Sequence, residues 1–239
     1  MAAEHRLGWR EPEKRDYETV YALDTFGALE QPSPVVIGIK WHDAFDRPVK
    51  DSDGSWWVGR GELGGARGGH CVCLKPPSMT DLPGAWQHYN QGREGACVGF
   101  GVSRAATLFN KPELFNGFSL YHKAQKRDEW PGESYSGTSV EAGLNTLRLD
   151  GAWTVRAGVT RGPVKVFGIR SFGWVKDGDG VLKAMQSRLD YVEFLNSWGM
   201  GYPNVVRMPV SVLDVLLQQG GEAGVPVDRP GPHAKRSGR

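Results

Sequence analysis

The chain of 239 residues is long enough for one large domain or two lobes that share a core, and its 29 Lys and Arg against 27 Asp and Glu give a net charge of +2. It has no basic stripe of the nucleic-acid-binding kind outside the C-terminal tail, and no stretch approaches the ~20 apolar residues of a membrane span, so we expect neither nucleic acid nor a membrane as partner. The charged N-terminus lacks the apolar run of a signal peptide, and three cysteines, an odd number, argue against a disulfide framework, which together predict a cytoplasmic, reducing location.

The N-terminal half is predicted to contain two strands and a central helix. Pro34–Trp41 is a β-branched run typical of a buried strand, and His70–Leu74 reads as a second, short strand. Ala96–Asn110 carries apolar residues around most of its circumference, which predicts a central helix, and Pro112 ends it. Further helices are predicted at Tyr17–Glu30, Leu114–Arg127 and Ser139–Leu149.

The C-terminal half is predicted to return to strands. They are expected at Val164–Ile169, Tyr191–Leu195 and Val205–Met208, with helices at Val181–Gln186 and Val210–Gln219. Residues 220–239 are rich in Gly, Pro and basic side chains without periodicity, which predicts a flexible basic tail. Strands toward both ends and helices in the middle indicate an α+β fold. We expect one domain over residues 1–219, with a β-lobe from residues 18–74 and 155–219 and a helical lobe from about 90–152.

Cys97 stands at the start of the predicted central helix, in the stretch QGREGACVGF. The positive end of a helix dipole lowers the pKa of a thiol and favours the nucleophilic thiolate. Gln91, shortly before it, can bring its side-chain amide to the same point, and this amide with the Cys97 backbone N–H would form an oxyanion hole. The plainer alternative is a buried helix cysteine, the commoner state of a free thiol.

This stretch resembles the active-site segment of papain-like cysteine peptidases, in which Gln-Gly precedes a small residue, the catalytic Cys and an aromatic-rich helix. Val98 replaces the Trp that usually follows the nucleophile, and Glu94 stands where secreted members have a further cysteine. The run FLNSWGMGYP resembles the family's Asn-Ser-Trp-Gly. The resemblance implies that Asn196 orients the catalytic imidazole and that Trp198 shields their hydrogen bond from water, completing a triad.

The resemblance also requires a histidine, and the family's usual place for it, shortly ahead of the Asn, holds none. ARGGHCVCL resembles the family's Gly-Gly-His-Ala-Val strand, and PVVIGIKWHDAF resembles the strand before it, although both precede Cys97. We therefore expect His70 to be the base in a circularly permuted papain-like fold of two lobes, because triads are recognised by geometry and not by chain order. A strand histidine with only a structural role is the alternative; His42, His88 and His122 are weaker candidates for the base.

The family's peptide cleft has a glycine edge, and YSGTSVEAGLNTLRLDGA resembles that segment, which implies that Gly137 and Thr138 bind substrate backbone. By the same analogy Ile37, Gly69 and Cys71 line the pocket for the residue before the cleaved one, beside Trp198. The implied function is hydrolysis of peptide bonds in a peptide or protein substrate, through a thioester and without a cofactor or metal. A catalytically inactive peptide-binding or assembly module is the alternative, and cleavage of cell-wall or isopeptide amides is a third reading.

Metal binding is a rival interpretation for one segment. His70, Cys71 and Cys73 lie close together in sequence, and imidazole and thiolate suit zinc. However, residues 70 and 71 point to opposite faces of a strand, and the sequence contains no paired C-x₂-C. We therefore expect no metal at this site.

Overall fold

The computed structural model describes residues 34–75, 88–109, 114–130, 136–151, 154–155, 172–175 and 190–228, which form an eight-stranded sheet, a two-stranded sheet, four α-helices and two short 3₁₀ helices. The elements in chain order are β1 (Val35–His42), η1 (Asp43–Asp46), β2 (Val49–Lys50), β3 (Trp56–Trp57), β4 (Ala66–Lys75), α4 (Cys97–Phe109), β5 (Leu114–Phe115), α5 (Gly117–Ala124), α6 (Val140–Asp150), β6 (Thr154–Val155), β7 (Phe172–Val175), β8 (Tyr191–Leu195), η2 (Gly199–Gly201), β9 (Val205–Pro209), α8 (Val210–Gln218) and β10 (Glu222–Asp228). The expected α+β class is confirmed. The elements predicted at residues 17–30, 164–169 and 181–186 lie outside the described residues.

The large sheet brings distant parts of the sequence together, in the order β2-β3-β9-β8-β4-β1-β10-β7. β4 lies at its centre, antiparallel to β1 on one side and to β8 on the other. A single parallel bridge, between β3 and β9, makes the sheet mixed. Because β4 pairs with β8, the ends of two strands more than a hundred residues apart in sequence become neighbours, and this arrangement positions the site described below.

The prediction of a flexible tail from residue 220 is wrong for residues 222–228. This segment forms β10, which is antiparallel to both β1 and β7. Its sequence, EAGVPVD, has few large apolar side chains, and so it gave no strand signal. The backbone of β1 supplies the pairing partners instead, with Gly38 opposite Glu222. The domain therefore extends at least to residue 228.

The helix predicted over residues 114–127 is shorter in the structure. Leu114 and Phe115 pair with β6, and α5 begins at Gly117. Asn116 sets this start, because its side chain accepts a hydrogen bond from the Ser119 backbone N–H as an N-cap. Ser139 caps α6 in the same way, by accepting from the Ala142 backbone N–H.

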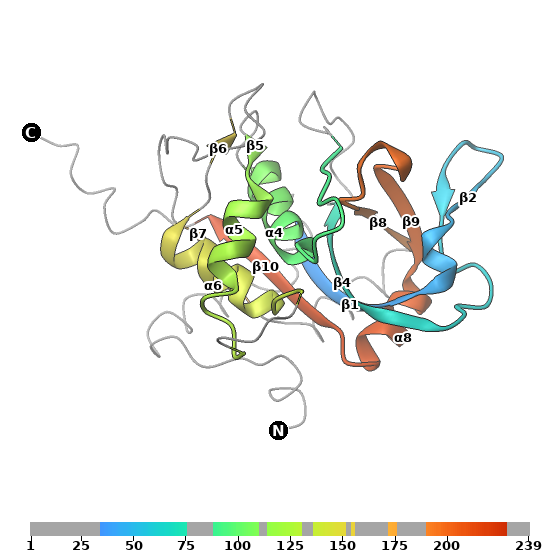
Figure 1. The fold of residues 1–239 in the computed structure, drawn as a ribbon. Coiled ribbons are helices and arrows are strands. Elements are labelled where there is room, and N and C mark those ends of the chain that lie inside the picture. Colours follow the sequence, from blue (N-terminus) through green and yellow to red (C-terminus); the bar gives the residue numbers. More distant parts are fainter. Residues whose placement is uncertain are drawn as a thin grey trace, which may run out of the picture.

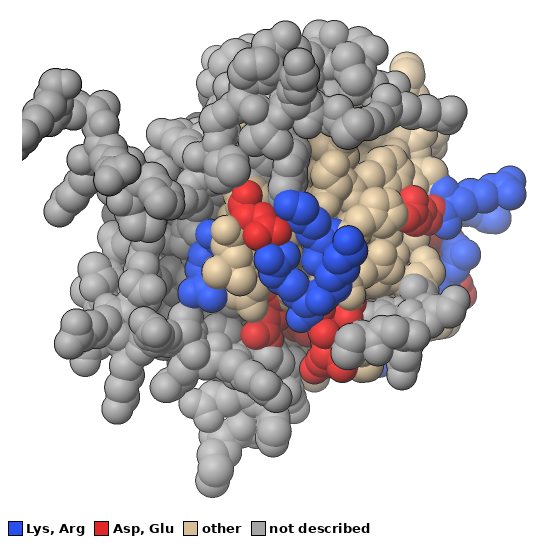
Figure 2. Space-filling model, turned by 60° about the vertical axis from the view of Figure 1, so that its left-hand side comes forward, with Lys and Arg blue, Asp and Glu red and all other residues tan. Residues whose placement is uncertain are grey.

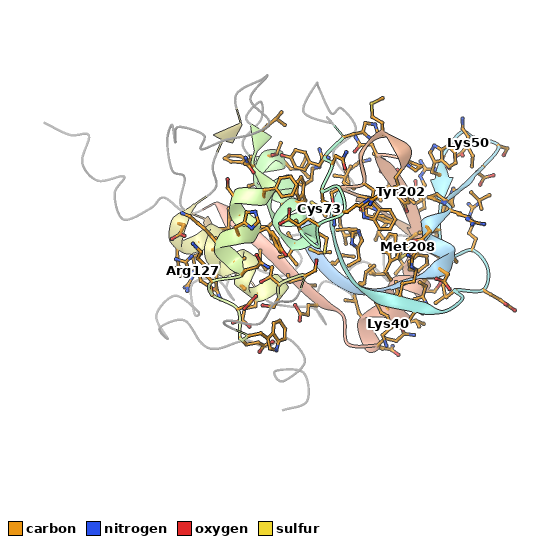
Figure 3. The ribbon with its side chains drawn as sticks, in the orientation of Figure 1. Lys40, Lys50, Cys73, Arg127, Tyr202 and Met208 are labelled. Carbon is orange, nitrogen blue, oxygen red and sulfur yellow. The ribbon has the colours of Figure 1, made fainter. Side chains whose placement is uncertain are left out.

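Two hydrophobic cores lie on opposite faces of the central strands. Alternate β1 residues Val35, Ile37, Ile39 and Trp41 face the first, the β core, which also receives Leu213 and Leu216 of α8. Val36 of β1 and Cys71 and Cys73 of β4 face the second, the helical core, together with residues of α4 and α6. In Figure 1 helices α4, α5 and α6 lie together beside the central strands, and α8 lies apart from them at the lower edge of the view, close to β1. In Figure 3 Cys73 lies by α4, whereas Met208 of the β core lies among the strands.

Acidic and basic side chains adjoin on the surface of the helices. Asp150 at the end of α6 accepts two hydrogen bonds from Arg127, at 2.8 and 2.9 Å, and lies 3.4 Å from the Lys123 ammonium. Figure 2 shows Lys and Arg side chains directly beside Asp and Glu side chains on the described part of one face. This mixture of signs is typical of a solvated surface.

Candidate functional site

Cys97 is the first residue of α4, and its side chain is partly exposed at the floor of a cleft. Burial raises the pKa of this thiol above its usual value, whereas the backbone N–H groups of Cys71, Val98 and Cys97 itself stabilise the thiolate and lower it. Burial has the larger effect, so the expected depression of this pKa is not found. The contact with the Cys71 backbone also shows that the sulfur lies against β4, one residue from His70.

His70 is held by a hydrogen bond that defines its protonation pattern. Its Nε2 lies 2.8 Å from Asn196 Oδ1, and the Ser197 backbone N–H donates to the same oxygen at 2.7 Å. Because a backbone N–H must donate, the atom between them is the amide oxygen, and His70 must donate through Nε2. In the neutral ring, Nδ1 therefore carries the lone pair, so this nitrogen is the one that can accept a proton.

Two tryptophans enclose the His70 imidazole. The ring centroid of Trp198 lies 5.0 Å from that of His70, and the centroid of Trp41 lies 4.6 Å away in an edge-on arrangement. The two indoles also contact each other at 5.1 Å. Trp41 is in turn fixed by a 2.9 Å hydrogen bond from its Nε1 to Asp46. The sequence gave no reason to single out Trp41, because an apolar residue in a buried strand is ordinarily core.

Burial in this apolar cage lowers the pKa of His70 to about 4 from 6.5, and the hydrogen bond to Asn196 opposes that shift only in part. The native ring is then neutral between these two pH values, whereas the ring in the unfolded chain binds a proton. Stability from this group is therefore complete above pH 6.5 and is lost as the pH falls to about 4.

We expect the free energy of unfolding to decrease by about 3 kcal/mol through this group across that interval, since each pKa unit corresponds to ~1.4 kcal/mol. Urea titrations at several pH values measure the loss. His70→Gln should lack this component, whereas His88→Gln, at an exposed position, should retain it. If His70 instead made the free energy of unfolding increase as the pH falls, the native ring would be an imidazolium, held by a thiolate.

Gln91 is fastened to the loop that carries Asn196. Its Oε1 accepts from Ser197 Oγ at 2.6 Å, and its backbone N–H donates to the Ser197 carbonyl at 2.8 Å. Its Nε2 donates to the Glu94 carbonyl at 2.9 Å, which uses one of two amide hydrogens. The second amide hydrogen could donate to an oxyanion. The role of Gln91 in an oxyanion hole therefore stays a prediction. Ser197 was missed as its partner, although it stands inside the Asn-Ser-Trp-Gly motif.

The cleft has a volume of about 590 Å³ and receives residues from β1, β4, the start of α4 and the segment before α6. Four of the predicted substrate-binding residues line it together with His70 and Cys97: Gly69, Cys71, Gly137 and Thr138. Ile37 does not line the cleft, and its side chain packs in the β core, whereas its neighbours Gly38 and Ile39 do line it. Trp198 packs over His70 and the β core rather than at the cleft wall.

The other candidate histidines lie elsewhere. His42 is buried, with its two ring nitrogens 3.1 Å from the Gly64 carbonyl and 3.2 Å from Gln219 Oε1. His88 and His122 are exposed. Within the described residues no group of three or more His, Cys, Asp or Glu side chains could hold a metal ion. The zinc interpretation of His70, Cys71 and Cys73 therefore gains no support.

None of the described helices is both long enough and apolar enough to cross a membrane. Comparison with known proteins gives no relative whose site could be set beside this cleft. No family model matches the chain, and no curated protein or solved structure is significantly similar to it.

Proposed function

We propose that this protein is a cysteine peptidase of papain-like type, with Cys97 as nucleophile, His70 as general base and Asn196 as the group that orients the base. The observation that carries the proposal is the hydrogen bond from His70 Nε2 to Asn196 Oδ1, beside a cleft that Cys97 also lines. It leaves Nδ1 as the basic nitrogen of a neutral ring, which is the state a general base needs. The enclosing tryptophans keep water from the hydrogen bond.

In the proposed reaction, the Cys97 sulfur attacks the carbonyl carbon of a peptide bond while His70 Nδ1 takes the thiol proton. Backbone N–H of Cys97 and the Gln91 amide stabilise the resulting oxyanion. The C–N bond then breaks, and the imidazolium gives its proton to the departing amine, leaving a thioester. Water, deprotonated by His70, hydrolyses the thioester, and the proton returns to the Cys97 sulfur.

The same proposal includes a permuted, two-lobed papain-like fold. The His-bearing strand precedes the nucleophile in sequence, and its pairing with β8 supports the proposal because His70 comes within hydrogen-bond distance of Asn196. The Lys75–Tyr89 connection, which we expected to cross between the lobes, lies largely outside the described residues. Chain order thus presents no geometric obstacle to acyl transfer.

Limited alkylation with iodoacetamide at neutral pH is expected to label Cys97 before Cys71 and Cys73. Cys97 is partly exposed, whereas the other two are buried, and burial raises the pKa of Cys73 to about 12. Peptide mapping by mass spectrometry gives the order. Hydrolysis of an unstructured protein substrate should be lost in parallel with labelling, and Cys97→Ala should be inactive. First labelling at Cys71 or Cys73 would remove Cys97 as the nucleophile.

A peptide-binding module without catalysis is the second candidate. The raised pKa of Cys97 and the low pKa of His70 favour it, because together they describe a neutral thiol and imidazole rather than a ready ion pair. In this case unstructured peptides would bind in the cleft but would not be hydrolysed. Alkylation of Cys97 would then weaken peptide binding, and no hydrolysis would be seen before or after it.

A further inference from the structure

The amide of Asn196 has one polar atom that the contacts described above do not use. The side chain is buried, and its Oδ1 accepts from His70 Nε2 and from the Ser197 backbone N–H. Its Nδ2 is also buried, but it forms no hydrogen bond of full geometry with the described residues. An unsatisfied amide end is costly in a buried place, so the group that faces Nδ2 decides where the amide rests.

Tyr202 lies on the same loop as Asn196 and is buried in the β core. It follows the short helix η2, and its backbone N–H donates to the Gly199 carbonyl at 3.3 Å. Its ring centroid lies 5.1 Å from that of Trp198, edge-on, and Trp198 in turn contacts the His70 ring. In Figure 3 the labelled Tyr202 lies among the strands, as does Met208. Tyr202 therefore belongs to the buried surroundings of the proposed base.

The hydroxyl of Tyr202 has a fixed donor direction. It donates to the Phe45 carbonyl oxygen at 2.9 Å, and a carbonyl can only accept. The phenol oxygen therefore keeps its lone pairs for a donor, and Asn196 Nδ2 is a buried donor that needs an acceptor. The pKa of the phenol agrees with this pairing: burial raises it, whereas the Asn196 side chain lowers it, as a hydrogen-bond donor to the phenol oxygen does.

Two contacts hold the plane of an amide better than one. The Ser197 backbone N–H fixes the oxygen end of Asn196, but the amide can still turn about that contact. A phenol oxygen at the nitrogen end stops the turning and keeps Oδ1 directed at His70 Nε2. The phenol is itself held by Phe45, in the short helix η1.

We infer that Tyr202 is a positioning residue whose hydroxyl accepts from Asn196 Nδ2 and thereby holds the amide that orients His70, an inference that rests on the proposed peptidase function. Tyr202→Phe tests it, because this change removes the hydroxyl and keeps the ring against Trp198. We expect kcat to fall about tenfold with KM unchanged, the effect of losing one hydrogen bond. In protein with isotope-labelled histidine, the His70 Nε2–H proton should exchange with water about tenfold faster, since its acceptor is less well held.

Tyr89→Phe is the matched control. The Tyr89 hydroxyl also donates to a backbone carbonyl, that of Phe115 at 2.9 Å, and it lies 3.0 Å from Thr107 Oγ1 of α4. Its loss should destabilise the fold in urea to a similar extent. It should leave kcat and the exchange of the His70 proton unchanged, because no contact joins this hydroxyl to Asn196 in the described part of the chain.

A double-mutant cycle shows whether Tyr202 acts through Asn196. In an Asn196→Ala background, Tyr202→Phe should not lower kcat further. The inference is overturned if Tyr202→Phe keeps the wild-type kcat or the wild-type exchange rate, or if its effect on kcat persists in full without Asn196. If the wild type hydrolyses no peptide, the proposed function fails by itself. Proton exchange at His70 then decides the inference, which stands only if Tyr202→Phe accelerates it and Tyr89→Phe does not.

Discussion

His70→Ala should lower kcat for peptide hydrolysis by about 10²–10⁴-fold, the contribution typical of a positioned general base. The variant removes the Nδ1 lone pair that would take the Cys97 proton, while Asn196 Oδ1 keeps the Ser197 backbone N–H as a donor. The remaining activity should increase with pH, because the reaction then depends on spontaneous ionisation of Cys97, whose pKa burial raises.

Asn196→Ala measures how much the orientation of the base contributes to the rate, as distinct from the presence of the base. It leaves the imidazole in place between Trp41 and Trp198 but removes the acceptor that selects its tautomer, so we expect a smaller loss than in His70→Ala. Steady-state kinetics with one peptide substrate measure both, and near-ultraviolet circular dichroism of the tryptophans checks that each variant is folded. Near-wild-type turnover in His70→Ala would disprove the assignment of the base and would direct the same test to His42, His88 and His122.

Gly99→Ala should destabilise the fold by about 3 kcal/mol, at the upper end of the usual cost of overpacking. A Cβ at this position would lie 2.2 Å from the Gly117 carbonyl oxygen and 2.8 Å from the Tyr121 backbone nitrogen, so α4 and α5 would have to separate. The better helix propensity of Ala offsets at most ~1 kcal/mol of this cost. Chemical denaturation monitored by tryptophan fluorescence gives the difference in the free energy of unfolding.

A control for Gly99→Ala exists in an open loop. A Cβ at Gly61 would meet nothing within 4 Å, so Gly61→Ala should leave the free energy of unfolding nearly unchanged. Since Gly99 is in the same turn of α4 as Cys97, a folded Gly99→Ala variant should also show slower alkylation of Cys97 or altered kcat. Equal stability of the two variants would show that α4 and α5 do not approach so closely.

The elements that the sequence predicted best are those with a strong apolar pattern. β8 covers the predicted residues, and α4 begins and ends within one residue of its predicted range, because their own side chains supply the burial that forms them. β10 could not be predicted, since it owes its strand conformation to the open edge of β1 and not to its side chains. β4 is longer than predicted for a similar reason, because Gly68 and Gly69 carry no strand signal and pair with Trp41 and Lys40.

The residues of the candidate site could be named from local motifs, but their environment could not. The motifs suggested Cys97, His70 and Asn196 one at a time, and the structure brings His70 and Asn196 into one hydrogen bond. The electrostatics depend on three-dimensional burial, which no local pattern contains: a helix N-terminus alone predicted a lowered thiol pKa, and burial reversed the direction. The edge-on packing of Trp41 on His70 likewise depends on strand register.

The separation of His70 from Asn196 by 126 residues has a consequence for synthesis on the ribosome. Cys97 and His70 are both translated in the first half of the given sequence, but Asn196, whose amide oxygen accepts from His70, follows long after, and β10 later still. Until β8 pairs with β4, a nascent chain has an imidazole without its acceptor and a sheet that still lacks β8, β9 and β10. Under the proposed peptidase function, this order would withhold proteolysis until residues 191–196 have left the ribosome and β8 can pair with β4.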